Sequence, residues 1–575
     1  MFWKGKGLLA GFCVFLLAFS ASAKKKDKYE VSKMPKALYL NEPESKEASR
    51  EFSPAECPEL KPGEDGAFGY LSMITSAGSR RSGSLEMRCA AEAVRRVLAG
   101  FGYRTEIVNY RFPYYFISDQ TFSIKDRRTG REIPAFPLMY SANTESAPEQ
   151  KVSGRVVRPS GLKNGDLVYV SGNIKDLARK AEKWQKAGAV GLVMDSKSFP
   201  YNMTGLPVPH MIHSTSWHYG ALPGLVVEDA GKLVGKEVEL RNLARIYAGR
   251  GYDVIGITPG EFENYILIGG HLDSWYMGAL DDGTGVALML RLAELLKDEK
   301  PGRTGLIFAA FDGEELGLFG SRVFCERFGP EKIKAMLNLD MVSVKNNFFY
   351  KDPARAKVMP KVFSVSPELM PLAKEFYGSL DCAKLWWSLE GFAGISGGRL
   401  PTDLEWFWSA GVPGIFVYTP DRYYHTELDN MRWMDAGDLE ELARASASLV
   451  RRMAAVDIPR PPDRPQMEFE FHRQDDGAVV FELHLSRGDN VNLHARPGPV
   501  VLCCYEQGFE KKVELKRGQG GGYRGVFYPL YQGEYEFVAS AVVDKVSLKI
   551  VKSMVIADPV KEGPKEPEKK KGGEK

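Results

Sequence analysis

Three short stretches of the 575-residue chain are apolar at every position, namely Tyr265–Ile268, Leu306–Ala310 and Ala335–Leu337. Runs of this length and texture are typical of strands that are covered on both faces, as in a parallel sheet. The segment between the first two, Val286–Lys297, places its apolar residues at helical spacing. The pattern therefore predicts a strand–helix–strand unit inside an α/β domain.

Polar clusters accompany these apolar runs. They are GGHLDSW (269–275), GALDDGTG (278–285), FDGEELGLFGS (311–321) and the end of LNLD (337–340). In open α/β sheets, ligands bind outside the carboxyl ends of the strands. The sequence therefore predicts that these clusters meet at one edge of the sheet and form the functional site.

The remaining pattern places further elements around this unit. We expect amphipathic helices at Leu85–Gly100 and Asp438–Val456, and strands at Tyr103–Phe112 and Pro413–Tyr418. Residues 341–400 show a less regular pattern. The expected fold class is α/β, a mostly parallel mixed sheet with helices on both faces.

Two stretches differ in texture from the α/β domain. Residues 118–243 combine short strands with a helix and predict an inserted α+β domain, and residues 466–556 alternate as the strands of a β-sandwich do. A proline-rich linker, 458–462, precedes the second stretch. The expected parts are a signal peptide (1–23), a polar leader (24–50), the α/β domain in two parts (51–117 and 244–457), the inserted domain (118–243), the sandwich-like module (466–556) and a disordered charged tail (557–575).

The first 23 residues are typical of a secretory signal. Lys4 and Lys6 precede an apolar stretch, Leu8–Phe19, and Ala21–Ala23 provides a cleavage site. The apolar stretch is shorter than the roughly 20 residues that cross a bilayer, so an uncleaved anchor is the less favoured alternative. We expect a secreted or periplasmic protein without stable membrane insertion after cleavage.

Composition narrows the range of partners. The chain is 44% hydrophobic and 26% charged, with a formal net charge of +3, which is too small to indicate nucleic acid as a partner. Six cysteines remain after signal cleavage, and their spacing matches no zinc-finger or redox motif. An oxidising compartment allows a Cys57–Cys89 bridge, and the sequence leaves the pairing open.

Nitrogen and oxygen ligands dominate the predicted site. The candidate metal ligands are His271, Asp281, Glu315, Asp340 and His425. Imidazole and carboxylate ligands suit zinc best, with manganese and cobalt as alternatives. Five ligands are too many for one tetrahedral catalytic zinc, but they suit two zinc ions about 3.5–4 Å apart that share a carboxylate. Asp281 lies centrally in the chain order and is the expected bridging ligand.

Three further residues complete the predicted chemistry. Asp273, two positions after His271, is expected to orient that imidazole. Glu314, the neighbour of Glu315, is expected to take a proton from the attacking water and return it to the leaving amine. Tyr424 is either an oxyanion stabiliser or a packed aromatic residue, and both interpretations stay open. Each residue alone also has a structural explanation, but their joint placement after buried strands favours the functional one.

Five segments together carry a family resemblance: HLDSW (271–275), DDG (281–283), EELG (314–317), NLD (338–340) and YHT (424–426). They resemble the motifs of the co-catalytic di-zinc exopeptidases, which include leucyl-type aminopeptidases, glutamate carboxypeptidases and the transferrin receptor. The resemblance covers about residues 50–120 and 244–456. It implies two zinc ions per chain held by the five ligands, with Asp281 bridging, Glu314 as base and a cis peptide bond after Asp281. Because all five ligands are present, it also implies an active enzyme rather than an inactive receptor.

The resemblance leaves the substrate and the assembly less well defined. Residues 118–243 resemble the protease-associated domain of this family, whereas the strand-rich module after 466 replaces the family's helical dimerisation domain, so the oligomeric state stays unassigned. Segment 401–407 lacks the histidine that many aminopeptidases carry there. Arg399 and Arg422 are candidates for holding a substrate carboxylate, but no dense arginine cluster accompanies them. We therefore expect an aminopeptidase acting on peptides; the alternatives are a glutamate carboxypeptidase or dipeptidase, a non-catalytic binding protein and a glutaminyl-cyclase-like transferase.

Overall fold

The computed structural model describes residues 57–557, except for gaps at 64–65, 117–120, 172–176, 196–220, 300–301, 396–399, 461–465, 487–492, 496–497, 506–507, 519–520, 530–531 and 544–545. The expected signal peptide, the leader, nearly all of the charged tail and Arg399 lie outside the described residues. The chain divides after Pro461 into two compact units, and each is described here by itself. Within the described part, every helix is too short or too polar to cross a membrane.

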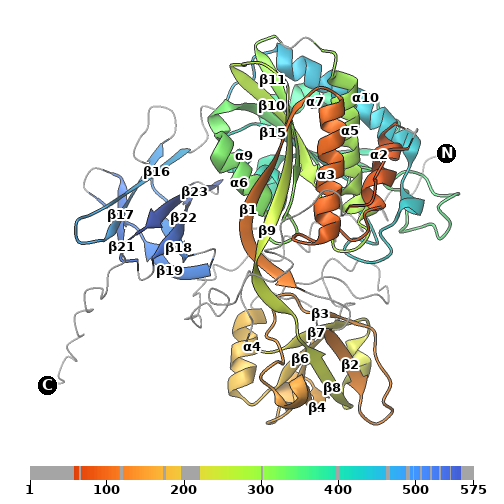
Figure 1. Cartoon of the computed structure of the whole chain (residues 1–575), viewed down its shortest axis with the longest axis vertical. Helices are drawn as coiled ribbons and strands as arrows, with labels where there is room; N and C mark the ends of the chain where they lie inside the picture. The colour runs from red at the N-terminus through yellow and green to blue at the C-terminus, as the bar shows by residue number, and fades with distance from the viewer. Residues whose placement is uncertain are drawn as a thin grey trace. The chain divides into compact units, whose positions relative to one another are not determined.

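An eight-stranded mixed sheet forms the centre of the first unit (Figure 1). In spatial order it contains β1 (Arg104–Phe116), β9 (Arg245–Ile257), β11 (Thr304–Phe311), β10 (Asn264–His271), β12 (Ile333–Leu339), β15 (Gly414–Tyr418), β13 (Lys361–Val365) and β14 (Lys384–Ser388). β10 pairs in parallel with β11 and β12, and β12 pairs in parallel with β15. β9 and β13 join these four strands in antiparallel orientation. The carboxyl ends of the four central strands therefore lie at the same end of the sheet.

Helices cover both faces of this sheet (Figure 1). The apolar cluster on one face includes residues of α2 (Gly66–Thr75), α3 (Leu85–Gly100), α5 (Gly285–Leu296), α7 (Met370–Tyr377) and α10 (Ala436–Ala455). The opposite face is contacted by α6 (Phe319–Phe328), α8 (Leu389–Ile395) and α9 (Leu404–Ser409). Both faces of the central strands are thus buried, which explains why their sequences are apolar at every position. The predicted α/β fold class is confirmed.

The stretch between 341 and 400, which looked less regular in sequence, contributes two strands and two helices to the same unit. β13, α7, β14 and α8 follow one another there. β14 lies at the edge of the sheet, and all five of its residues are half-buried. A strand with this uniform burial shows neither an apolar run nor an alternation, so sequence periodicity does not reveal it.

A buried ion pair ties β13 to α10. The fully buried Lys361 Nζ lies 2.5 Å from Asp438 Oδ2 and donates to the Val342 carbonyl at 3.0 Å. We expect Lys361→Met to lower the free energy of unfolding by about 3–5 kcal/mol, because it leaves the Asp438 carboxylate buried without its cation. Denaturant unfolding measures the change, with exposed Lys357→Met as the control. A loss below about 1 kcal/mol would contradict this account of the pair.

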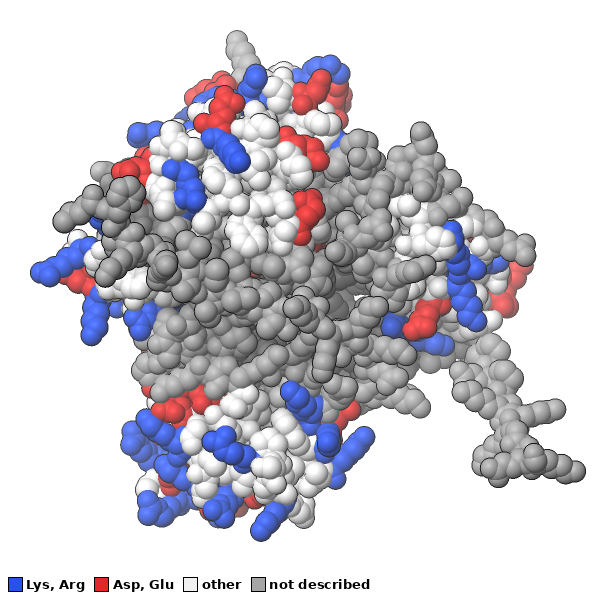
Figure 2. All heavy atoms as spheres, turned by 180° about the vertical axis from the view of Figure 1, so that it is seen from behind, with Lys and Arg blue, Asp and Glu red and all other residues white. Residues whose placement is uncertain are grey.

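A separate seven-stranded sheet is built by residues 122–242. In spatial order it contains β2 (Phe122–Asp126), β8 (Glu237–Asn242), β4 (Val152–Val157), β5 (Leu167–Val170), β6 (Gly191–Asp195), β7 (Gly224–Val227) and β3 (Ala135–Pro137), with α4 (Leu177–Lys186) packed beside it. β1 and β9 pair along their whole length and carry the chain out to this sheet and back (Figure 1). Figure 2 shows Lys and Arg side chains gathered on this lower part of the molecule.

The second unit consists of two four-stranded antiparallel sheets. One contains β16 (Gln466–Arg473), β17 (Val479–Ser486), β21 (Tyr523–Phe527) and β20 (Lys516–Arg517), and the other contains β19 (Gly508–Glu514), β18 (Val500–Tyr505), β22 (Gly533–Val543) and β23 (Val546–Ile556). Aromatic residues of both sheets meet in one core, where the rings of Phe481 and Phe537 have centroids 5.0 Å apart. The alternating pattern after residue 466 thus corresponds to strands that bury one face each.

Candidate active site

The five predicted metal ligands converge at the end of the eight-stranded sheet where the four central parallel strands have their carboxyl ends. His271 is the last residue of β10, Glu315 and Asp340 follow the ends of β11 and β12, and His425 lies in the loop after β15. Asp281 lies in the turn Ala279–Thr284, which leads into α5. The peptide bond between Asp281 and Asp282 is cis. The parallel arrangement of the four strands is what brings residues from distant segments to one place.

Asp281 lies between two histidines. Its Oδ1 is 3.2 Å from His271 Nε2, which in turn lies 3.7 Å from Asp340 Oδ1. Its Oδ2 is 3.2 Å from His425 Nε2, which lies 2.8 Å from Glu315 Oε2. The residues therefore form two histidine–carboxylate pairs, and each oxygen of Asp281 faces one of them.

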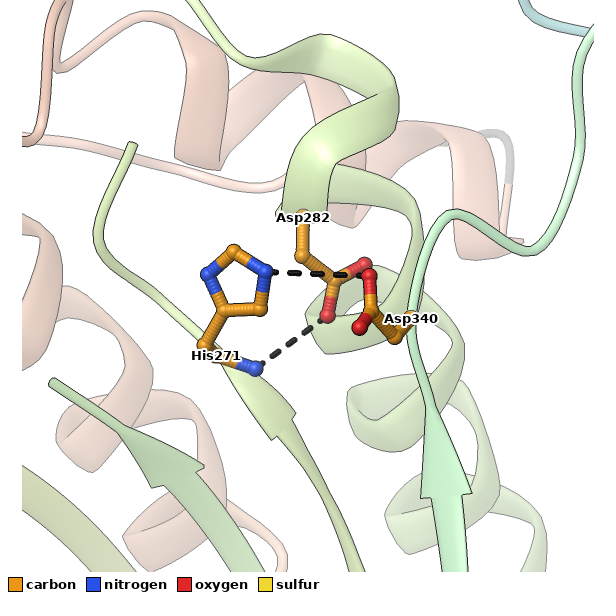
Figure 3. Close-up of side chains that lie close together, drawn as sticks. All are labelled: His271, Asp282 and Asp340. Carbon is orange, nitrogen blue, oxygen red and sulfur yellow. Dashed lines mark hydrogen bonds and ion pairs between the residues drawn. The ribbon is translucent and has the colours of Figure 1, made fainter. Parts of the chain in front are cut away.

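Asp282 also lies in the site, but its carboxylate is engaged by the backbone. Its Oδ2 accepts the His271 N–H at 3.2 Å, and its Oδ1 accepts the N–H groups of Gly285 at 2.8 Å and Met341 at 3.0 Å. Figure 3 shows Asp282 below the start of α5, with His271 on one side and Asp340 on the other. Its contacts hold the ends of β10 and β12 against the start of α5, so we interpret it as a structural residue.

The donor atoms of the two pairs fit divalent metal ions. Asp281 Oδ2, Glu315 Oε1, Asp340 Oδ1 and His425 Nε2 are buried and have no hydrogen-bond partner within the described residues. Buried polar atoms without partners are rare in folded proteins and indicate a bound group. Imidazole nitrogen together with carboxylate oxygen is a donor set that suits zinc. The residues present therefore fit two metal ions that share Asp281.

The electrostatics of the site reflect an excess of buried carboxylates. Burial opposes the charged form of His425, yet Glu315 and Asp281 together raise its pKa to about 10. Burial raises the pKa of Glu315 to about 7, with Asp281 adding to the increase against the opposing effect of His425. Such mutual shifts show that the cluster favours additional positive charge.

Asp273 contacts His271 through its own backbone carbonyl group, and it contacts Glu314 and Glu315 through its side chain. The nearest acceptor to His271 Nδ1 is the Asp273 carbonyl oxygen at 3.0 Å, whereas the Asp273 carboxylate is 3.6 Å away. The carboxylate instead accepts the N–H groups of Glu314 and Glu315, both at 3.2 Å, and the Ser82 hydroxyl at 3.0 Å. Asp273 thus orients His271 through its carbonyl group and fixes the two glutamates through its side chain.

Glu314 and Tyr424 directly precede the candidate ligands Glu315 and His425 in the chain. Burial raises the pKa of Glu314 well above its usual range; His271 opposes this effect, and Glu315 adds to it. The Tyr424 ring stacks on His425, with centroids 3.8 Å apart and planes 19° from parallel. The packed-aromatic interpretation of Tyr424 thus has a contact to support it, and its role toward an oxyanion stays a prediction.

Arg80 supports the site from the loop between α2 and α3, and the sequence did not single it out. Its guanidinium is fully buried and donates to the carbonyl groups of Leu272 at 2.7 Å, Met277 at 2.6 Å and Gly278 at 2.9 Å. These carbonyls belong to the segment that joins His271 to Asp281. An arginine in a polar loop usually faces solvent, so no local signal distinguishes it.

We expect Arg80→Met to lower the free energy of unfolding by about 3 kcal/mol or more. The carbonyl groups of Leu272 and Met277 would lose the Arg80 donor, whereas that of Gly278 keeps the Gly283 N–H; an unsatisfied buried group costs about 1–3 kcal/mol. Denaturant unfolding of the variant beside exposed Arg96→Met measures the effect. If the two variants were equally stable, the three contacts of Arg80 would have no energetic importance.

Asp429 and Thr402 are two further site residues that sequence reasoning missed. The buried Asp429 carboxylate accepts the N–H groups of Leu280 at 2.8 Å and Asp281 at 3.1 Å, and so holds the turn that presents the bridging carboxylate. Thr402 Oγ1 lies 3.5 Å from Asp340 Oδ2. Asp429 follows His425 by four positions, and this closeness was the available signal. Arg422, a candidate for substrate binding, donates to the Asn347 carbonyl at 3.4 Å.

The sheet, its helices and the two histidine pairs that share Asp281 are the fold and the site that the predicted metallopeptidase class requires. Residues 253–450 match the model of "Peptidase family M28". The matched segment contains all five predicted metal ligands, so this part of the chain is similar to a peptidase family, in agreement with the resemblance drawn from the sequence motifs.

Curated relatives match about a third of the chain. The mouse protein "Aminopeptidase NAALADL1" is 30% identical over 187 residues, which are 30% of this chain and 25% of that protein. An aminopeptidase of Pseudomonas aeruginosa is 30% identical over 207 residues, 32% of this chain and 36% of that protein. A probable glutamate carboxypeptidase of Zea mays is 28% identical over 230 residues, 37% of this chain and 31% of that protein. The matches thus span about a quarter to a third of these relatives' lengths.

Solved structures share the fold. A zinc aminopeptidase from Bacillus subtilis superposes with a TM-score of 0.54 and 18% identity, covering 69% of this chain and 96% of that one. An aminopeptidase from an Aneurinibacillus strain gives a TM-score of 0.50 at 19% identity and covers 68% of this chain and 94% of that one. At this identity the likeness concerns the fold alone.

Proposed function

We propose that this protein is an exopeptidase that binds two zinc ions per chain and removes residues from the amino ends of peptides. The observation that carries the proposal is the position of Asp281, whose two oxygens face different histidine–carboxylate pairs. A carboxylate shared in this way is what a site for two adjacent metal ions requires. The aminopeptidases among its relatives support the choice of peptide end.

The side chains of the site divide the work of hydrolysis in this proposal. His271, Asp340 and one oxygen of Asp281 would hold one zinc ion, and His425, Glu315 and the other oxygen would hold the second. Zinc ions held there would polarise the scissile carbonyl group and activate water. Glu314 takes the proton of the attacking water and delivers it to the leaving amine.

Two residues assist these steps in the proposal. The Asp273 carboxylate accepts the N–H groups of Glu314 and Glu315, and so keeps the proton carrier and a metal ligand in fixed relative positions. The Tyr424 hydroxyl donates to the oxyanion that forms on the substrate carbonyl. Its ring is held by stacking on His425, which supplies the rigidity that such a donor needs.

The test combines metal analysis with substrates that differ at their ends. We expect the purified protein to contain about two zinc ions per chain, to lose activity with a chelator and to regain it with zinc. It should hydrolyse leucine p-nitroanilide but not the N-acetylated compound. Cleavage of N-blocked peptides that requires a free carboxylate would instead identify a carboxypeptidase, the activity named for the maize relative. Protein without metal or hydrolytic activity would refute the proposal.

We also propose that the protein acts outside the cytoplasm after removal of residues 1–23. The structure joins Cys57 and Cys89, 32 positions apart, in a disulfide. Disulfides persist mainly in oxidising compartments, and this bond therefore supports the secreted or periplasmic location. Amino-terminal sequencing of the mature protein is expected to begin at Lys24. An intact Met1 on protein retained in the cytoplasm would contradict the proposal.

The sheet of residues 122–242 is proposed to be an inserted protease-associated domain that limits access to the site. The ring of Phe136 lies 5.9 Å from that of Tyr276. Tyr140 belongs to the same apolar cluster as Trp275 and Leu316, which flank the metal ligands. These contacts support a position of part of the insertion close to the proposed metal site.

A further inference from the structure

A cavity of about 670 Å³ opens at the amino ends of the central strands, at the opposite end of the sheet from the metal ligands. Its wall includes Asn264 and Thr304, the first residues of β10 and β11, and Lys334 near the start of β12. β10 has eight residues, so about 23 Å separates the two ends at roughly 3.3 Å per residue. Cavities of about 300–1,000 Å³ are the usual size for small organic ligands.

Apolar side chains from three helix ends form part of the wall. Phe101 and Tyr103 follow α3, Leu296 ends α5, and Val450 lies in the last turns of α10. Leu306 of β11 adds to this surface. Together these residues offer an aromatic and aliphatic surface for the body of a ligand.

Most of the charges around the cavity neutralise one another. Arg303 binds Glu263 through two hydrogen bonds of 2.7 and 2.5 Å, and Arg451 binds Glu299 at 2.7 Å. The charged lining residues outside these two pairs are Lys297, Lys334 and Asp457. The lining thus retains one more positive than negative group.

Lys334 is the half-buried cation among these groups. Its ammonium donates to the Ala454 carbonyl at 3.1 Å and more weakly to Thr304 Oγ1 at 3.4 Å. Neither acceptor is charged, and within the described residues Lys334 forms no ion pair. Burial lowers its pKa; Asp457 opposes this effect, and Arg303 adds to it. An ammonium with three N–H groups and two neutral acceptors has one donor left for an anion.

We propose that this cavity binds a small organic carboxylate with an apolar body. The carboxylate pairs with Lys334, and the body packs against Phe101, Tyr103 and Leu296. A simple aryl alkanoate and a free apolar amino acid share this chemistry, and an amino acid additionally places its ammonium group near Asp457. Because the cavity and the metal ligands lie at opposite ends of the sheet, this site is separate from the proposed peptidase site.

Calorimetric titration of the full, zinc-loaded chain tests the proposal. The probes are 3-phenylpropionate, phenylalanine and 2-phenylethylamine, which lacks the carboxylate. We expect saturable binding of at least one of the two acids and none of the amine. Lys334→Met is expected to weaken the acid at least tenfold, whereas Lys332→Met, an exposed lysine outside the cavity, should bind like the unaltered protein.

A second variant separates loss of the cavity from loss of the fold. Ala455 is exposed and lines the cavity, so Ala455→Trp fills the space while Lys334 stays in place, and it should also abolish binding. If phenylalanine binds more tightly than 3-phenylpropionate and Asp457→Asn removes the difference, the cavity is an amino-acid site. If 3-phenylpropionate binds as tightly or more tightly, the cavity is a site for plain acids. Absence of saturable binding of either acid would overturn the proposal. Equal binding by Lys334→Met would also overturn it, because the acid would then occupy another site, such as the metal ions.

Discussion

Replacing Glu314 by glutamine is expected to lower kcat about 10²–10⁴-fold while the zinc content stays unchanged. General acid–base catalysis by a positioned side chain contributes an acceleration of about this size. Glutamine keeps the shape of the side chain but neither accepts nor returns the proton. Glu314 is not one of the five residues that form the two histidine–carboxylate pairs, so its replacement removes the proton carrier and leaves the ligands in place.

The measurement compares kcat, KM and zinc content for Glu314→Gln and for a control, Glu331→Gln. Glu331 is an exposed residue of the turn Pro330–Lys332, and its replacement should change none of the three quantities. A Glu314→Gln protein with near-normal kcat would show that another group moves the proton. A parallel loss of zinc would show that Glu314 is a ligand rather than the base.

Replacing Asp281 by asparagine is expected to reduce the zinc content from about two ions per chain to one or fewer. The reason is geometric, since each oxygen of Asp281 faces a different histidine. Asparagine retains one oxygen and presents an amide nitrogen to the other position, and the amide carries no negative charge. Hydrolysis should fall with the metal content, because a two-metal mechanism needs both ions.

Metal analysis after dialysis measures this effect, with exposed Asp298→Asn as the control. Asp282→Asn provides a second comparison. Its carboxylate accepts three backbone N–H groups, so this variant should lose folding stability, as measured by denaturant unfolding. Two zinc ions retained by Asp281→Asn would contradict the bridging role.

The placement of the candidate ligands after buried strands was accessible from sequence because it depends on local signals. An apolar run followed at once by polar residues indicates the carboxyl end of a buried strand, and this pattern located His271, Glu315 and Asp340. The half-buried β14 at the sheet edge gave no such signal. Arg80 gave none either, because its three carbonyl partners lie almost 200 positions later in the chain.

Sequence alone was sufficient for the α/β class, the strand–helix–strand centre and the group of candidate ligands that meets at the strand ends, since these depend on periodicity and on residue chemistry. The sequence named Asp281 as the bridging ligand but gave Asp282 no role, and only the tertiary structure showed what each of these adjacent, chemically identical side chains contacts. One carboxylate faces two histidines and the other accepts backbone N–H groups. The difference is decided by the direction of each side chain, which depends on how the turn is held by Asp429 and by the backbone at Gly285 and Met341.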